Sequence, residues 1–130
     1  MRLADVKRRK VAHCWSIATL RAHREVLAVQ FADVDTNALA SLVVIGDSSI
    51  AFKDYPAVRR AGDQSTWRVD DEGVFSASSF DILFVADSPY GFVMATTWAG
   101  AEGEDAELMV ADSAGNFRTL SKAYRYWSPS

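Results

Sequence analysis

Apolar and polar residues alternate along most of the chain with a period of two, which is the pattern of half-buried β-strands. Clusters of Asp, Gly, Ser and Asn separate the apolar runs and are typical of turns, because Asp and Asn bond their own backbone and Gly adopts positive φ. The pattern places strands near residues 38–45, 49–53, 66–69, 74–78, 81–86, 92–98, 107–111 and 117–126. The segments left as longer loops are 56–64 and 99–105. Short strands joined by tight turns predict a mainly β fold, an antiparallel meander.

The first thirty residues permit two interpretations. Residues 3–30 contain no Gly or Pro, so helix propensity alone allows a helix. At 100° per residue, however, their apolar side chains scatter around the helical wheel and define no buried face. A period of two fits better, with one alternating run over Val11–Thr19 and a second over Val26–Phe31. We therefore expect strands, with a short helix over Leu3–Lys10 compatible with either interpretation; the alternative is an α+β fold with an N-terminal helix and an antiparallel sheet.

One sequence pattern occurs twice. The segment Leu83–Ser88 returns 25 residues later as Leu108–Ser113, and Phe92 and Phe117 follow at the same offset. Two interpretations stay open. The two hairpins are related units, or they are alike only because any two antiparallel hairpins with Asp-Ser turns have similar sequences.

Length and composition indicate one globular domain. The 130 residues are 49% hydrophobic and 24% charged, close to the globular average. We divide the chain into a basic N-terminal arm, residues 1–10, and a single β-rich domain, residues 11–130. The apolar runs fall well short of the roughly 18–20 residues of a membrane-spanning helix. One cysteine, Cys14, cannot form an internal disulfide, and no signal-peptide pattern is present, so we expect an intracellular, cytoplasmic protein.

The charge is unevenly distributed. The net charge is −3, yet the run Lys7, Arg8, Arg9 and Lys10 makes the N-terminal arm strongly basic. Such a run is either a nuclear-localisation or phosphate-contacting patch, or a solvated arm. The acidic remainder of the chain repels a phosphate backbone, so the charge favours the solvated arm over nucleic-acid binding.

Sets of residues that carry known chemistry are missing from the sequence. The imidazole and thiol ligands are His13, His23 and Cys14, which lack the spaced pairs of a zinc site. No G-x-S-x-G nucleophile elbow and no Gly-rich phosphate loop occurs. We therefore expect no catalytic residues, no metal and no cofactor, and a protein that is not an enzyme.

Aromatic residues gather in the C-terminal third, and aromatic side chains are favoured at protein interfaces. The interface candidates are Tyr90, Trp98, Tyr124, Tyr126 and Trp127. The alternative places Trp15, Trp98 and Tyr124 around the pocket of a small-molecule-binding barrel or of a small α+β enzyme.

The stretch Thr19–Phe31, with His23 before a V-x-x-V-x-F strand, is similar to the opening of a WD40 blade. Leu39–Ser41 and Gly46–Asp54 then fall where that family has its second strand, its aspartate turn and its third strand. The resemblance implies a part-propeller-like fold and a structural hydrogen-bond relay of His23, Ser41 and Asp47. Ala22 stands where the family has Gly, and Lys53-Asp54 stands where it has Trp-Asp.

The resemblance also implies a function. A blade takes roughly 40–45 residues and a closed propeller typically 4–8 blades, so this chain supplies about two. Two blades leave sheet edges and an apolar face uncovered, which invites pairing with another chain. We therefore expect a scaffold or protein–protein interaction module that docks in an oligomer or a larger complex, with no membrane partner.

Overall fold

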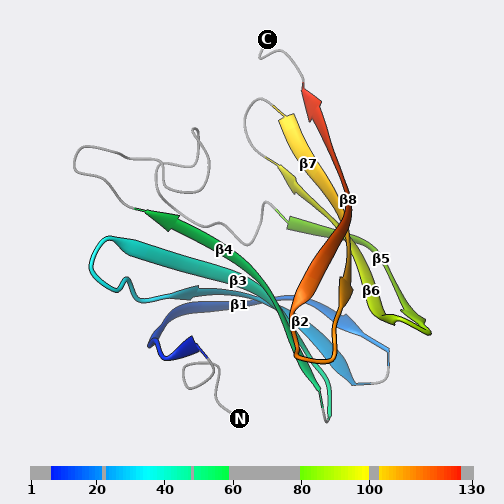
Figure 1. Ribbon diagram of the computed structural model, residues 1–130, viewed down its shortest axis with the longest axis horizontal. Helices are drawn as coiled ribbons and strands as arrows, with labels where there is room; N and C mark the ends of the chain where they lie inside the picture. Colours follow the sequence, from blue (N-terminus) through cyan, green and yellow to red (C-terminus); the bar gives the residue numbers. More distant parts are fainter. Residues whose placement is uncertain (1–6, 22, 48, 59–79, 100–102, 127–130) are drawn as a thin grey trace.

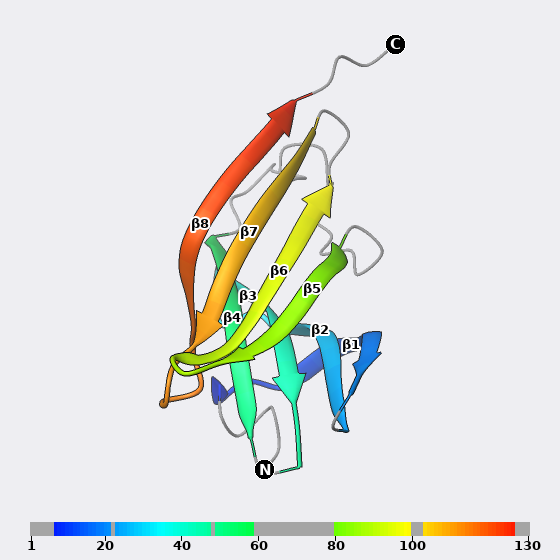
Figure 2. The same cartoon turned by 90° about the vertical axis from the view of Figure 1, so that its right-hand side faces the viewer.

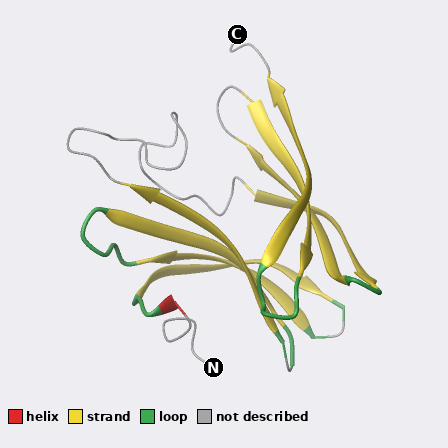
Figure 3. Ribbon diagram, viewed as in Figure 1, coloured by secondary structure: helices red, strands yellow, loops and turns green. Residues whose placement is uncertain are grey.

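Every named element of the computed structural model is a β-strand, which confirms the mainly β prediction. The structure describes residues 7–21, 23–47, 49–58, 80–99 and 103–126. The strands are β1 (Val11–Leu20), β2 (Arg24–Phe31), β3 (Asn37–Ile45), β4 (Ile50–Val58), β5 (Phe80–Ser88), β6 (Gly91–Ala99), β7 (Gly103–Ala111) and β8 (Phe117–Tyr126). They form two antiparallel four-stranded meanders, sheet A in the order β1-β2-β3-β4 and sheet B in the order β5-β6-β7-β8 (Figures 1 and 3). These are two open sheets rather than a closed barrel or an α+β arrangement.

The residues at the tight turns explain their backbone conformations. In the β5–β6 turn, Gly91 has φ +133°, and an added Cβ would lie 2.3 Å from the carbonyl oxygen of Ala111. In the β7–β8 turn, Asp112 Oδ1 accepts the backbone N–H groups of Ala114 and Asn116 at 2.9 and 3.0 Å. The repeated Asp-Ser pattern of the sequence thus ends two hairpin strands, β5 and β7, of the same sheet.

Two expected loops are partly strand. β4 continues through Pro56 to Val58, and β7 begins at Gly103 rather than after Asp105. Proline is accepted in β4 because β4 is an edge strand, where a missing N–H need not break a ladder. The acidic start of β7 pairs with β8, with Glu104 opposite Arg125 in the register. The expected strands at 66–69 and 74–78, and residues 3–6 of the expected helix, lie outside the described residues.

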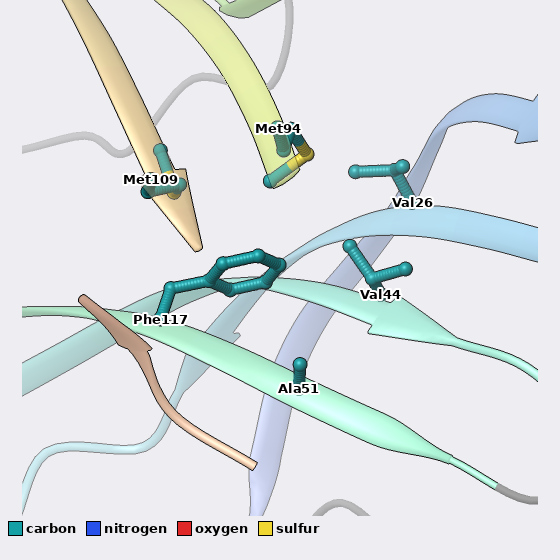
Figure 4. Close-up of a cluster of buried hydrophobic side chains, with 6 residues drawn as sticks. All are labelled: Val26, Val44, Ala51, Met94, Met109 and Phe117. Atoms are coloured by element: carbon teal, nitrogen blue, oxygen red, sulfur yellow. The ribbon is translucent and has the colours of Figure 1, made fainter. Parts of the chain in front are cut away.

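The two sheets pack face to face around a shared apolar core. Val26, Val44 and Ala51 of sheet A meet three side chains of sheet B, which are Met94, Met109 and Phe117 (Figure 4). A second cluster joins Ala28, Ala40 and Leu42 to Phe80 and Trp98. At the turn end, the Phe52 N–H donates to the Gly115 carbonyl oxygen at 2.9 Å, so the β7–β8 turn is tied to β4.

Sheet A is also buried on its other face. Val29, Phe31, Val43 and Phe52 form a cluster in which each residue is at most 4% exposed. Lys7 of the N-terminal arm reaches this face, with its Nζ 4.4 Å from the centre of the Phe52 ring. Burial on both faces explains why β3 is an almost continuous apolar run.

We predict that Met109→Ala lowers the free energy of unfolding by about 2–5 kcal/mol, because the fully buried side chain fills the space between the sheets. Chemical denaturation monitored by tryptophan fluorescence measures the effect. Leu120→Ala is the control, since Leu120 is 49% exposed. Equal losses in the two variants would contradict this account of the core.

Candidate interaction surface

The face of sheet B that points away from sheet A carries large exposed apolar side chains. On β5, Ile82 and Val85 both pack into the core although they are three residues apart. A register shift between Ile82 and Phe84 makes this possible, because the extra residue of a β-bulge changes the side of the sheet to which the following side chains point. Leu83 and Phe84 are consequently 57% and 53% exposed.

Strand β8, at the opposite edge of sheet B, also contains a β-bulge. Its register shifts beside Leu108 and Met109, which pair with Ser121 and Thr119 and leave Leu120 as the extra residue. Leu120 is 49% exposed, while Phe117 earlier in the strand is buried in the core. Both edge strands of this sheet therefore present a leucine at a bulge.

The two bulges share one cross-strand row. Phe84 pairs with Ala95, Ala95 with Leu108, and Leu108 with Ser121. We call the residues of this row that are apolar, together with the two bulge leucines, the bulge band: Leu83, Phe84, Ala95, Leu108 and Leu120. Figure 2 looks onto this face, and none of the described elements lies in front of it.

The aromatic interface candidates lie in different places. Tyr90, in the β5–β6 turn, is 85% exposed, and Tyr124 on β8 is 56% exposed. Trp98 is 9% exposed and stacks on Phe80 at 4.9 Å between ring centres, so it belongs to the core in this fold. The Tyr126 side chain and Trp127 lie outside the described part.

A mixed aromatic and ionic cluster lies between the sheets. Tyr55 meets Trp98 edge-on at 5.0 Å between ring centres. Lys53 Nζ lies 3.2 Å from Glu107 Oε2, and Thr119 donates its hydroxyl to the same carboxylate. Burial raises the pKa of Tyr55 well above its ordinary value, and the negative charges of Glu107 and Asp105 raise it further. The cluster thus links the sheets through a partly buried ion pair, in which the Lys53 side chain is 21% exposed and that of Glu107 is 9% exposed.

The cavity beside this cluster is small. Its volume is about 70 Å³, and Tyr55, Trp98 and Glu107 are among its lining residues. Ligand pockets usually measure about 300–1,000 Å³. Of the residues expected around an aromatic pocket, Trp98 lines this cavity and Trp15 packs against the same core cluster.

Open clefts lie at the turn end on either side of Arg24. One of about 730 Å³ is bounded by the β3–β4, β5–β6 and β7–β8 turns, and another of about 530 Å³ lies beside Leu20 and Val85. The Arg24 guanidinium lies 3.1 Å from an Asp87 carboxylate oxygen and 4.6 Å from the centre of the Phe92 ring. These contacts of Arg24 join sheet A to sheet B.

The relay residues implied by the WD40 resemblance are spread along sheet A. Ser41 is fully buried in β3 and donates its hydroxyl to Asp54 Oδ1 at 2.6 Å. Lys7 Nζ lies 2.7 Å from the other oxygen of that carboxylate. His23 and Asp47 are exposed in the β1–β2 and β3–β4 turns. The sequence analysis did not identify Asp54 as the acceptor of Ser41. The two residues are recognised as a pair only from the β3–β4 register, which places them opposite each other.

The basic run is partly used within the fold. Besides the ion pair of Lys7, Arg9 donates to the Asn37 carbonyl oxygen at 3.0 Å. The Lys10 carbonyl oxygen accepts the Ala32 N–H at 2.8 Å. Arg8 and the Lys10 side chain are exposed, so the four residues do not act as one uniform charged patch in the described structure.

The described residues also bear on other classes of function. They contain no cluster of three or more His, Cys, Asp or Glu residues arranged to hold a metal ion. Within the same residues, no helix has the length and apolar character to cross a membrane.

Comparisons with protein-family models, with curated proteins and with solved structures gave no match to this chain. The candidate site therefore rests on its own geometry.

We predict that stability falls as the pH rises above about 10, the ordinary pKa of tyrosine. The unfolded chain loses the Tyr55 proton there, while the folded chain keeps it, so the stability present below this pH decreases by up to about 1.4 kcal/mol per unit. Urea unfolding between pH 8 and 11 should show a shallower fall for Tyr55→Phe than for Tyr124→Phe. Identical slopes would contradict the raised pKa.

We also predict that Ser41 and Asp54 are energetically coupled. Asp54→Ala leaves the buried Ser41 hydroxyl without its acceptor and should cost about 1–3 kcal/mol. A double-mutant cycle with Ser41→Ala should give a coupling energy of about 1 kcal/mol. The matched cycle of Ser41→Ala with Asp47→Ala should give none. Coupling to Asp47 instead of Asp54 would restore the relay interpretation.

Proposed function

We propose that this chain is a non-enzymatic protein–protein interaction module that docks through the outer face of sheet B. The observation that carries the proposal is the exposure of Leu83 and Phe84, 57% and 53%, at a bulge that turns both away from the core. Adjacent large apolar side chains exposed on an ordered sheet mark an interaction site, because their burial by a partner is favourable.

The shape of the surface supports a protein partner. The bulge band crosses four strands, a width of roughly 14 Å at about 4.8 Å per strand spacing. It is a broad sheet face rather than a closed cavity, and protein interfaces favour such surfaces with an apolar centre and a polar rim. Tyr90, 85% exposed in the adjoining turn, adds an aromatic side chain near the β5 end of sheet B.

The edge strands β1 and β5 are less suited to pairing with a partner strand. β1 contains two register shifts and β5 contains one. Bulges at sheet edges hinder the addition of another strand. Docking therefore uses the face of sheet B and its side chains rather than main-chain hydrogen bonds at these edges.

A small-molecule pocket at the aromatic cluster has less support. The cavity at the aromatic cluster, about 70 Å³, is well below the usual range of ligand pockets, and its charged side chains already pair across the sheets. Membership of the WD40 class and a scaffold role in a larger assembly stay predictions from the sequence.

Site-specific photo-crosslinking tests the proposal. A benzoyl-phenylalanine side chain placed at position 84 should form protein adducts in purified samples or in cell extract. The same group at position 34 should not, although Val34 is 47% exposed, because it lies in the β2–β3 turn away from the bulge band.

Two results of the crosslinking experiment would decide whether docking occurs at the bulge band. Adducts at position 84 that disappear when Leu120→Asp is added would assign docking to the bulge band. No adduct at position 84, or equal yields at positions 84 and 34, would contradict the proposal. The substituted chains should unfold within about 0.5 kcal/mol of the parent, since the positions are exposed.

A further inference from the structure

The outer face of sheet B is a nearly square grid of side chains. Three cross-strand rows are complete in all four strands, and they are Asp81-Thr97-Ala106-Ala123, Phe84-Ala95-Leu108-Ser121 and Ala86-Val93-Val110-Arg118. Neighbouring strands are about 4.8 Å apart, and rows two residues apart along a strand are separated by about 6.8 Å. The grid is therefore about 14 Å wide and about 14 Å tall.

Charge occurs at two opposite corners of this grid. Asp81 stands at the β5 end of the first row and Arg118 at the β8 end of the last, and both are exposed. The other two corners carry Ala86 and Ala123, which are also exposed. The positions between the corners are uncharged. The grid thus has one negative corner, one positive corner and two small corners.

This arrangement is complementary to itself under a twofold rotation. Consider a second copy placed face to face, with the rotation axis in the interface along the Ala86–Ala123 diagonal. A diagonal axis exchanges the two charged corners, so Asp81 of each copy lies opposite Arg118 of the other. The same axis passes over Ala86 and Ala123, where each small side chain meets its own equivalent and allows the sheets to approach.

The strands of the two copies would then cross at about 90°, which is one of the two preferred geometries of sheet packing. The rotation moves Phe84 from the edge of one copy over Val93 and Val110 of the other. It also moves the β8 bulge, with Leu120, over Thr97 and Ala106. Each exposed bulge side chain is therefore placed over a row whose central residues are uncharged, and of these Val110 and Thr97 are themselves 4% and 8% exposed.

We propose that the partner docked on this face is a second copy of the chain, in an isologous dimer whose sheets B cross at right angles. This inference rests on the proposed function and names its partner. A twofold dimer needs a self-complementary surface, and a grid with opposite charges at opposite corners meets that requirement. The area is small compared with the roughly 800 Å² per partner of a standard interface, so we expect a weak dimer that forms at high protein concentration.

Sedimentation equilibrium on charge-exchange variants tests the proposal. Asp81→Arg places two arginines together at each charged contact, and Arg118→Asp places two aspartates there. Each should weaken the dimer by about tenfold or more. The double variant Asp81→Arg with Arg118→Asp should return to nearly the parent affinity. Asp47→Arg, which makes the same charge change in the exposed β3–β4 turn, should leave the dimer unchanged.

The outcomes separate this inference from the proposed function. Loss in both single variants with recovery in the double variant would support the dimer. A parent chain that stays a 14.3 kDa monomer up to its solubility limit, or a dimer indifferent to both single changes, would overturn it. If position 84 then crosslinks to a different protein in extract, docking at the bulge band stands and only the second copy is excluded.

Discussion

The packing of sheet B onto sheet A is the interaction on which the rest of the structure depends. Each sheet has four strands, and neither could bury its apolar face without the other. Met94 and Met109 are fully buried between them, and flexible methionine side chains fill the irregular space between twisted sheets. Because one face of sheet B is committed to this core, its other face is the surface that remains for a partner.

The same constraint explains the bulges. β5 contains a run of four large apolar residues, Ile82 to Val85, more than one strand face can bury in the core. The register shift directs Ile82 and Val85 inward and leaves the two residues between them outside. β8 repeats the arrangement around Leu120. Both edges of the sheet thereby contribute to a single apolar band.

The sequence predicted the strands well and the surface poorly. Period-two alternation and Asp-Gly turns located most of the described strands, because each is a local property of the chain. The bulges could not be predicted from the sequence, because a one-residue register shift depends on how the strand pairs with its partner strand. Trp98 was assigned to an interface from its type alone, yet its burial follows from stacking on Phe80, 18 residues earlier in the chain. Asp54 was missed as the acceptor of Ser41 for the same reason, since cross-strand register decides it.

The central claim, that the outer face of sheet B is a docking surface for a second copy of the chain, is tested most directly by methyl-resolved NMR with a soluble paramagnetic probe at low and high protein concentration. The account predicts that the Leu83 and Leu120 methyl signals are broadened by the probe in dilute samples and protected in concentrated ones. The Val34 methyl signals, from an exposed turn residue, should stay accessible in both. Protection confined to surfaces other than this face would contradict the account.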